Sequence, residues 1–65
     1  MAFAWVYLDS RGEEAGRSDP FDDRQAAEDW MGTAWEDLLE RGYQEVALLD
    51  VGADRRLYRM GLGPA

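Results

Sequence analysis

The segment from Asp22 to Gly42 constrains the fold more than any other part of the chain, because it has the pattern of an amphipathic helix. Its apolar residues recur at intervals of three and four positions, which places them on one helix face. The centre of this face consists of Ala27, Met31, Ala34 and Leu38. We therefore predict a helix over roughly residues 23–41 that packs on the rest of the chain through these side chains.

Signals for both ends of this helix flank the apolar face. Asp22 is the predicted N-cap, and Gln25 three residues later completes a capping box, in which each side chain bonds to the backbone of the other residue. Gly42 can adopt the left-handed conformation that ends many helices. Tyr43 would then follow as the last residue of a Schellman motif.

Apolar and aromatic segments on both sides of the helix predict four strands. They span residues 3–8, 13–18, 44–51 and 56–62. The element order is therefore ββαββ in a single α+β domain over residues 1–65. The helix joins strands two and three by a right-handed crossover that skips one strand. We therefore expect a four-stranded antiparallel sheet in the order 2-1-3-4, with the helix packed on one face.

The first predicted strand is apolar on both sides. A single helix covers only one face of a sheet, so one apolar surface should stay exposed in a monomer, and surfaces of this kind usually mark interfaces. The two sides of the strand are formed by one triplet of aromatic residues and one of smaller residues. The triplets are Phe3, Trp5 and Tyr7, and Ala4, Val6 and Leu8.

The helix carries two large residues, Trp30 and Trp35, and large side chains pack best against small ones. The triplet of smaller residues is therefore predicted beneath the helix. The aromatic triplet is predicted on the open face, beside residues of the fourth strand. The interface expected there consists of Phe3, Trp5, Tyr7, Tyr58 and Arg59.

The chain contains no cysteine, histidine or lysine, which excludes most catalytic chemistry. Zinc and thiolate sites lack ligands, and Schiff-base and P-loop chemistry lack their lysine. Asp19, Asp22 and Asp23 could approach a calcium ion, but their spacing is not that of an EF-hand, and capping explains Asp22. We expect no catalytic residue, no cofactor and no metal. An enzyme that uses paired carboxylates is the remaining catalytic alternative.

The net charge of −7 is concentrated on the predicted helix. Residues 22–41 contain seven acidic residues and two arginines, which gives −5 for this segment. Such a charge opposes phosphate binding, so the aromatic triplet is not expected to be a nucleic-acid platform. No apolar run reaches the ~20 residues of a membrane span, and residues 1–5 lack the basic start of a signal peptide, so we expect a cytoplasmic protein.

Core and cap residues recur in a spaced pattern over nearly the whole chain. The positions are Trp5, Val6, Tyr7, Leu8, Asp9, Gly12, Phe21, Ala27, Glu28, Asp29, Trp30, Trp35, Leu38, Gly42, Val46, Leu48, Tyr58, Met60 and Leu62. This pattern resembles small uncharacterised acidic proteins of GC-rich actinobacteria. Because the shared positions are structural, the resemblance implies a fold and no particular activity.

Two functions fit these features. The first is a small interaction or regulatory module without catalytic activity, which forms a homodimer through the uncovered sheet face. The alternative is an acidic inhibitor or nucleic-acid mimic, whose helix face binds a basic surface of another protein. Steep salt dependence of partner binding would favour the acidic inhibitor.

Overall fold

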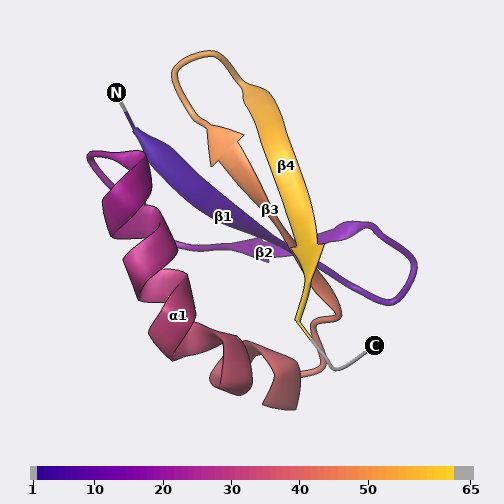
Figure 1. The fold of residues 1–65 in the computed structure, drawn as a ribbon. Coiled ribbons are helices and arrows are strands. Elements are labelled where there is room, and N and C mark those ends of the chain that lie inside the picture. The colour runs from indigo at the N-terminus through magenta and orange to yellow at the C-terminus, as the bar shows by residue number, and fades with distance from the viewer. Residues whose placement is uncertain (1, 63–65) are drawn as a thin grey trace.

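The computed structural model describes residues 2–62 and contains one sheet and one helix (Figure 1). In chain order, the elements are β1 (Phe3–Leu8), β2 (Glu14–Arg17), α1 (Arg24–Glu40), β3 (Glu45–Asp50) and β4 (Arg55–Gly61). The sheet has the order β2-β1-β3-β4, and all neighbouring strands are antiparallel. The predicted ββαββ fold and its sheet order are therefore confirmed. In the described part of the chain, no helix combines the length and the apolar character that a membrane span requires.

The N-cap of the helix is Asp23, one residue later than the predicted Asp22. The Asp23 carboxylate, and not that of Asp22, accepts a hydrogen bond from the backbone N–H of Ala26, at 2.7 Å. Gln25 consequently takes no part in a capping box, and its side chain donates to Asp29 one turn further along α1, at 2.9 Å. Both aspartates suit an N-cap by residue type, so the path of the chain into α1 decides between them.

That path is set by two backbone hydrogen bonds between Phe3 and Phe21, with N–H to oxygen distances of 2.9 and 2.6 Å. They tie the segment before the helix to β1. With Phe21 held at the sheet, Asp22 lies in the connecting bend. Asp23 has the extended backbone of an N-cap, with φ −141° and ψ 168°.

The predicted end of the helix is confirmed. Arg41 is the C-cap, and Gly42 follows in the left-handed region with φ +98°. The Gly42 N–H donates to the carbonyl of Leu39 at 3.0 Å, and the Tyr43 N–H donates to the carbonyl of Leu38 at 3.2 Å. This pair of hydrogen bonds is a Schellman motif, which satisfies two carbonyls at the end of α1.

The helix covers the aromatic side of β1, so the predicted choice of face is wrong. Trp5 and Tyr7 belong to a buried cluster that also contains Ala27, Met31 and Leu38 of α1. Within this cluster, the Trp5 indole N–H donates to the backbone carbonyl of Ala27 at 2.8 Å. Large residues do face small ones, but the large ring comes from the sheet and the small residues come from the centre of the helix stripe. The two tryptophans of α1 lie at the margins of that stripe, where one is half-buried and the other exposed.

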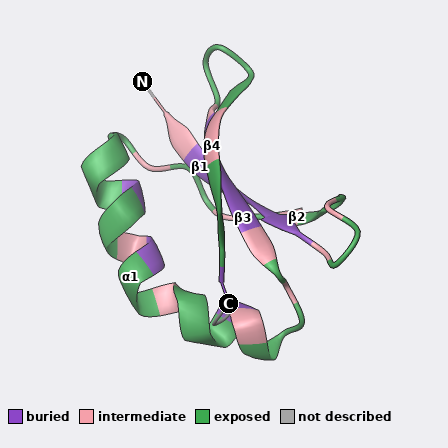
Figure 2. Ribbon diagram, turned by 45° about the vertical axis from the view of Figure 1, so that its right-hand side comes forward, coloured by how far each residue is buried: buried purple, intermediate pink, exposed green. Residues whose placement is uncertain are grey.

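The opposite face of the sheet has no helix, yet its apolar residues are buried as well. They belong to the two central strands and are Ala4, Val6, Leu8, Ala47 and Leu49 (Figure 2). Long charged side chains from the edge strands lie beside them. Glu14 of β2 forms ion pairs with Arg17 at 2.6 Å and with Arg56 of β4 at 4.0 Å, which connects the two edges. The apolar patch expected on the uncovered face is therefore absent from residues 2–62, because the stems of charged side chains cover it.

A register shift at Leu57 sets which side chains of β4 face the helix. Beyond this bulge, Tyr58 and Met60 pair with residues of β3 that belong to the buried cluster beneath α1. Arg56 and Arg59 pair with residues of β3 that form the opposite face. The apolar side chains of β4 therefore point to the helix side, and two of its three arginines point away from it.

Trp5→Phe should lower the free energy of unfolding by about 2–3 kcal/mol, because it removes a buried hydrogen bond to Ala27 and leaves a cavity. The exposed Trp35 provides the matched control, since Trp35→Phe should change stability by less than about 0.5 kcal/mol. Urea denaturation measures both effects. Equal losses for the two variants would show that Trp5 does not anchor the helix.

Asp23→Ala should destabilise the chain by about 1 kcal/mol through loss of the N-cap hydrogen bond. Asp22→Ala, which removes an equal charge next to the cap, should have an effect within about 0.5 kcal/mol. Thermal melts followed by circular dichroism distinguish the two. A larger loss of stability for Asp22→Ala than for Asp23→Ala would show that Asp22 is the N-cap, as predicted from the sequence.

Candidate functional site: the α1–β4 groove

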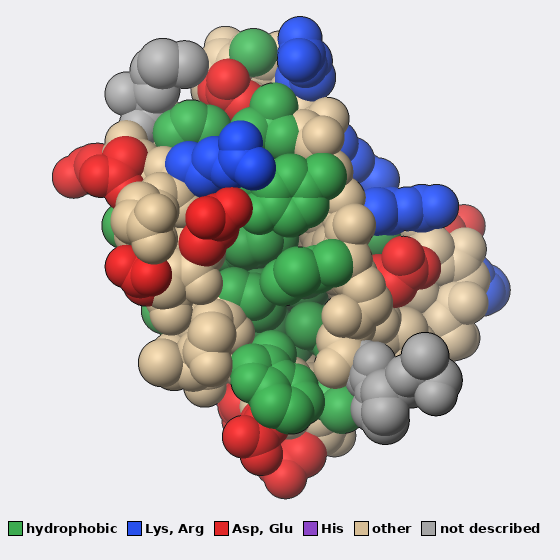
Figure 3. All heavy atoms as spheres, in the orientation of Figure 1, with side chains coloured by type: hydrophobic (Ala, Val, Ile, Leu, Met, Phe, Trp, Pro, Cys, Tyr) green, Lys and Arg blue, Asp and Glu red, His purple; other side chains and the backbone are tan. Residues whose placement is uncertain are grey.

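Because α1 lies over β1, it leaves part of the same sheet face open on the side of β4. The backbone of α1 approaches β1 more closely than any other strand, and β4 is the second strand beyond β1 in the sheet. The space between α1 and β4 is a groove of ≈ 380 Å³, called here the α1–β4 groove. Its lining residues are Trp5, Glu28, Met31, Gly32, Trp35, Tyr58, Met60, Gly61 and Leu62. Figure 3 shows its hydrophobic side chains as a green strip that runs between α1 and β4.

Most of this lining is apolar, and each wall contributes one exposed hydrophobic side chain. Trp35 from α1 and Met60 from β4 are each 40% exposed. Within residues 2–62, Val51 is the other large hydrophobic residue with comparable exposure, and it lies in the β3–β4 turn, away from the groove. Exposed apolar side chains scattered singly need no explanation, but two that converge on one groove make this groove the candidate functional site.

Gly32 gives the groove part of its depth. A Cβ atom at this position of α1 would meet no neighbouring atom within 4 Å, so the absent side chain leaves open space. Glycine inside a helix costs about 1 kcal/mol relative to alanine, and the fold shows no close packing at Gly32 that would require it. No internal packing therefore requires a glycine at this position, and the effect of Gly32 is to keep the groove open.

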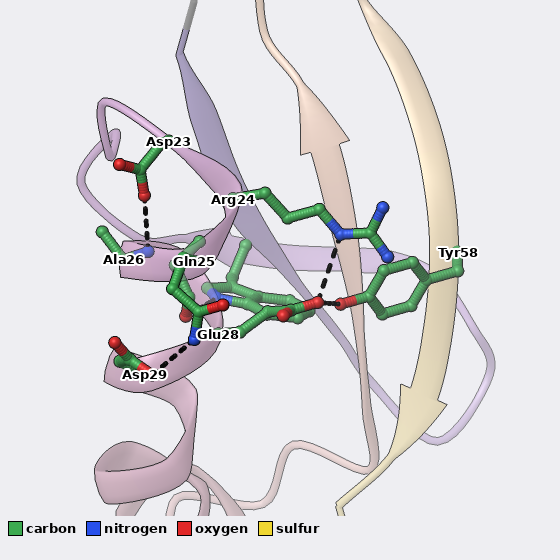
Figure 4. A network of polar contacts seen from close by, with 9 residues as sticks. Asp23, Arg24, Gln25, Ala26, Glu28, Asp29 and Tyr58 are labelled. Atoms are coloured by element: carbon green, nitrogen blue, oxygen red, sulfur yellow. Dashed lines mark hydrogen bonds and ion pairs between the residues drawn. The ribbon is translucent and has the colours of Figure 1, made fainter.

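A polar network closes the groove toward the start of α1 (Figure 4). The Tyr58 hydroxyl donates to the Glu28 carboxylate at 2.8 Å, and Arg24 donates to the same oxygen at 3.2 Å. The Arg24 guanidinium also lies 5.1 Å from the centre of the Tyr58 ring, which is within the range of a cation–π contact. These three side chains link α1 to β4, although the two backbones are not in contact.

The network shifts the pKa values of all three of its side chains away from neutrality, and the pKa of Arg24 is raised mainly by its hydrogen bond to Glu28. The hydrogen bond from Tyr58, and then that from Arg24, lowers the pKa of the Glu28 carboxyl. Burial raises the pKa of the Tyr58 phenol, and its hydrogen bond to Glu28 raises it further. Glu28 is therefore ionised and Tyr58 neutral at pH 7. Because the pKa of Glu28 is lower in the folded than in the unfolded chain, its contacts stabilise the fold above the unfolded pKa. This contribution is lost as the pH falls through the folded pKa.

The structure distributes the five predicted interface residues over different environments. Trp5 and Tyr7 are buried beneath α1, and Phe3 is half-buried beside them. Tyr58 lies in the α1–β4 groove, where Trp5 forms part of the lining. Arg59 is on the opposite face of the sheet and forms an ion pair with Glu45 at 3.8 Å.

Sequence reasoning did not identify the residues that make the groove accessible, namely Gly32, Trp35 and Met60. Each carried a signal. Gly32 is an unfavourable residue inside a strong helix pattern, Trp35 lies at the edge of the apolar stripe, and Met60 alternates with Tyr58 along β4. These signals point to one site only after the position of α1 over the sheet is known.

A second hollow lies on the other side of α1 and is more polar. Its lining residues are Tyr7, Arg17, Ser18, Asp19, Phe21, Trp30 and Arg41. Of the aspartates considered for calcium, Asp23 is engaged as the helix cap. In the described range 2–62, no group of three or more acidic side chains is close enough to hold a metal ion.

Comparison of the chain with models of protein families, with curated proteins and with solved structures finds no match. Function is therefore inferred from the geometry of the groove.

Tyr58→Phe should raise the pKa of Glu28 toward the ordinary value of glutamate, because it removes the main cause of the downward shift. A pH titration of the Glu28 carboxyl by NMR measures this change. Asp9 is the internal control: backbone N–H groups of Glu13 and Arg11 lower its pKa, and the substitution leaves them in place. An unchanged pKa at Glu28 would contradict the hydrogen bond from Tyr58.

Proposed function

We propose that this chain is a small protein-interaction module without catalytic activity, and that its binding surface is the α1–β4 groove. The observation that carries the proposal is the convergence of Trp35 and Met60, both 40% exposed, on one apolar groove. Apolar surface of this kind with charged residues around it is typical of protein contacts. Tryptophan is also among the residues that contribute most to interface energies.

The polar groups of the groove favour a protein partner over a small-molecule substrate. A small-molecule site usually offers a few polar groups that orient the ligand. In this groove, Tyr58 and Arg24 already donate to Glu28, so these groups are engaged with one another. Partner binding would therefore depend mainly on burial of Trp35, Met60 and the groove floor, at about 25 cal/mol per Å² of apolar surface.

The acidic face of α1 supports the alternative function, an inhibitor or nucleic-acid mimic that binds a basic protein. Asp29, Glu36 and Glu40 are exposed, and they lie on the side of the helix away from its buried stripe. Binding through these carboxylates would weaken steeply as salt is added, because exposed charges are screened. Binding through the apolar groove would persist at high salt, so the salt dependence separates the two candidates.

A groove-filling variant tests the proposal. Gly32→Trp should fold, because there is open space at Gly32 and glycine is unfavourable in a helix, but the new side chain would occupy the groove. Thr33→Trp adds the same side chain at the next position, which is exposed and does not line the groove. Each tagged variant and the parent would be used to capture proteins from an extract of the native cells, with identification by mass spectrometry.

We expect the parent and Thr33→Trp to retain the same bound protein, and Gly32→Trp to lose it while it keeps a cooperative thermal melt. Retention by Gly32→Trp at the level of the parent would exclude the groove as the binding surface. If the parent itself loses the captured protein at moderate salt, the acidic face of α1 would be favoured as the binding surface instead.

A further inference from the structure

The polar hollow on the other side of α1 is a second site, separate from the α1–β4 groove. It is called here the Tyr7 hollow and has a volume of ≈ 490 Å³. We infer that the Tyr7 hollow binds a free α-amino acid with an apolar side chain. A hydroxyl without a partner, a cationic group, an anionic group and two aromatic rings surround this one space. The inference goes beyond the proposed function and does not depend on what binds in the α1–β4 groove.

The hydroxyl of Tyr7 is the first feature that points to a ligand. The Tyr7 side chain is only 9% exposed, and buried tyrosine hydroxyls normally have a hydrogen-bond partner. Within residues 2–62 this hydroxyl forms no hydrogen bond, and it is not sealed from solvent. Burial, and then the neighbouring Tyr43, raises the pKa of the Tyr7 phenol, so the hydroxyl is protonated at pH 7 and can donate to a bound anionic group.

Opposite charges flank this hydroxyl. The positive charge of Arg41 lowers the pKa of Tyr7 and the negative charge of Asp19 raises it, so both charges lie close to the same atom. Both residues also line the hollow. A simple anion would be repelled by Asp19 and a simple cation by Arg41, whereas a ligand that carries both charges suits both residues. A zwitterion has no net charge, so the net charge of −7 on the chain does not oppose its binding either.

Two arginines line the hollow, and they differ in how firmly they are paired. Glu14 accepts hydrogen bonds from Nε and Nη2 of Arg17, at 2.6 and 3.1 Å, so Arg17 contributes a wall and is not counted as a ligand-binding group. Arg41 pairs with Asp37 at 3.1 Å, and the side chains of this pair are 64% and 60% exposed. Such a pair is weak, and one carboxylate does not occupy the five N–H donors of a guanidinium. Arg41 is therefore the cation that can bind the carboxylate of the amino acid, together with the Tyr7 hydroxyl.

Asp19 is held at the hollow by bonds that leave its carboxylate free. The Ser18 hydroxyl donates to the backbone carbonyl of Asp19 at 2.9 Å and accepts from the backbone N–H of Trp5 at 2.8 Å, which ties this segment to β1. Pro20 restricts the chain on the other side. In the described part of the chain, the Asp19 carboxylate forms no ion pair. It can therefore accept from the ammonium group of the ligand at little cost in ordering.

Two aromatic rings supply the apolar wall. The ring centres of Phe21 and Trp30 are 5.5 Å apart, and both side chains are half-buried. Phe21 is fixed at the sheet by its backbone hydrogen bonds to Phe3, and Trp30 projects from α1. An apolar side chain on the ligand would pack against these rings while its charged groups bind at Tyr7, Arg41 and Asp19.

Titration of the ¹⁵N-labelled chain with L-leucine and L-phenylalanine, each up to about 10 mM, tests the inference by NMR. We expect saturable shifts of backbone amide signals around the Tyr7 hollow, and none around the α1–β4 groove. L-Phenylalaninamide lacks the carboxylate, and N-acetyl-L-phenylalanine lacks the ammonium group. Each should bind about tenfold more weakly than L-phenylalanine, because each loses a hydrogen bond between charged groups.

Substitutions identify the residue that binds each charged group. Asp19→Asn should weaken L-phenylalanine about tenfold but should not weaken N-acetyl-L-phenylalanine, which has no ammonium group to lose. Asp22→Asn is the matched control, because it removes an equal charge from an exposed residue outside the hollow, and it should leave binding unchanged. Tyr7→Phe keeps the buried ring and removes the hydroxyl, so it should weaken L-phenylalanine about tenfold while the chain keeps a cooperative thermal melt.

The absence of saturable shifts with both amino acids would overturn the inference. Equal affinity for L-phenylalanine and its two derivatives would do so as well, since the ring alone would then be bound. Equal effects of Asp19→Asn and Asp22→Asn would show that Asp19 does not bind the ammonium group, which also contradicts the inference. None of these results bears on capture of a protein by the α1–β4 groove, so the failure of one proposal is distinguishable from the failure of the other.

Discussion

The hydrogen bond from the Trp5 indole to the Ala27 carbonyl determines how the rest of the structure is arranged. It lies in the buried cluster, where a polar group without a partner would be costly, and it joins a fully buried side chain of the sheet to the backbone of the helix. The backbone of Trp5 is fixed as well, because its N–H donates to the Ser18 hydroxyl and its carbonyl accepts from the Ser18 N–H, both at 2.8 Å. Trp5 thus holds β1, the segment after β2 and α1 in one arrangement.

This anchor places α1 over β1, and a single helix in that position cannot cover four strands. The two faces of the sheet are therefore covered in different ways. On the face without a helix, the edge strands supply glutamate and arginine side chains whose stems shield the small apolar residues of the central strands. On the helix face, the strip above β4 stays partly open, because Gly32 and Gly61 provide no side chain to fill it. The groove is therefore a direct consequence of where Trp5 holds the helix.

The Arg24–Glu28–Tyr58 network limits how far α1 and β4 can separate. Without it, the walls of the groove would be linked only through the core, because no backbone contact joins the helix to β4. Charged and aromatic groups thereby hold the start of the groove at a defined width, while the other end, at Trp35 and Met60, remains apolar and accessible. A partially rigid apolar groove loses less conformational freedom on binding than a flexible one, which favours association.

The sequence by itself determined the element order, the sheet order, the apolar helix face and the Schellman end at Gly42, because periodicity and backbone preference act over a few neighbouring residues. Only the tertiary structure decided between Asp22 and Asp23 as the N-cap, since the bridge between Phe3 and Phe21 positions the chain there. It also decided which side of β1 the helix covers, because a strand that is apolar on both sides is locally ambiguous. The groove depends on that choice. Its walls come from residues about 25 positions apart, and no local sequence pattern indicates that Trp35 and Met60 line the same groove.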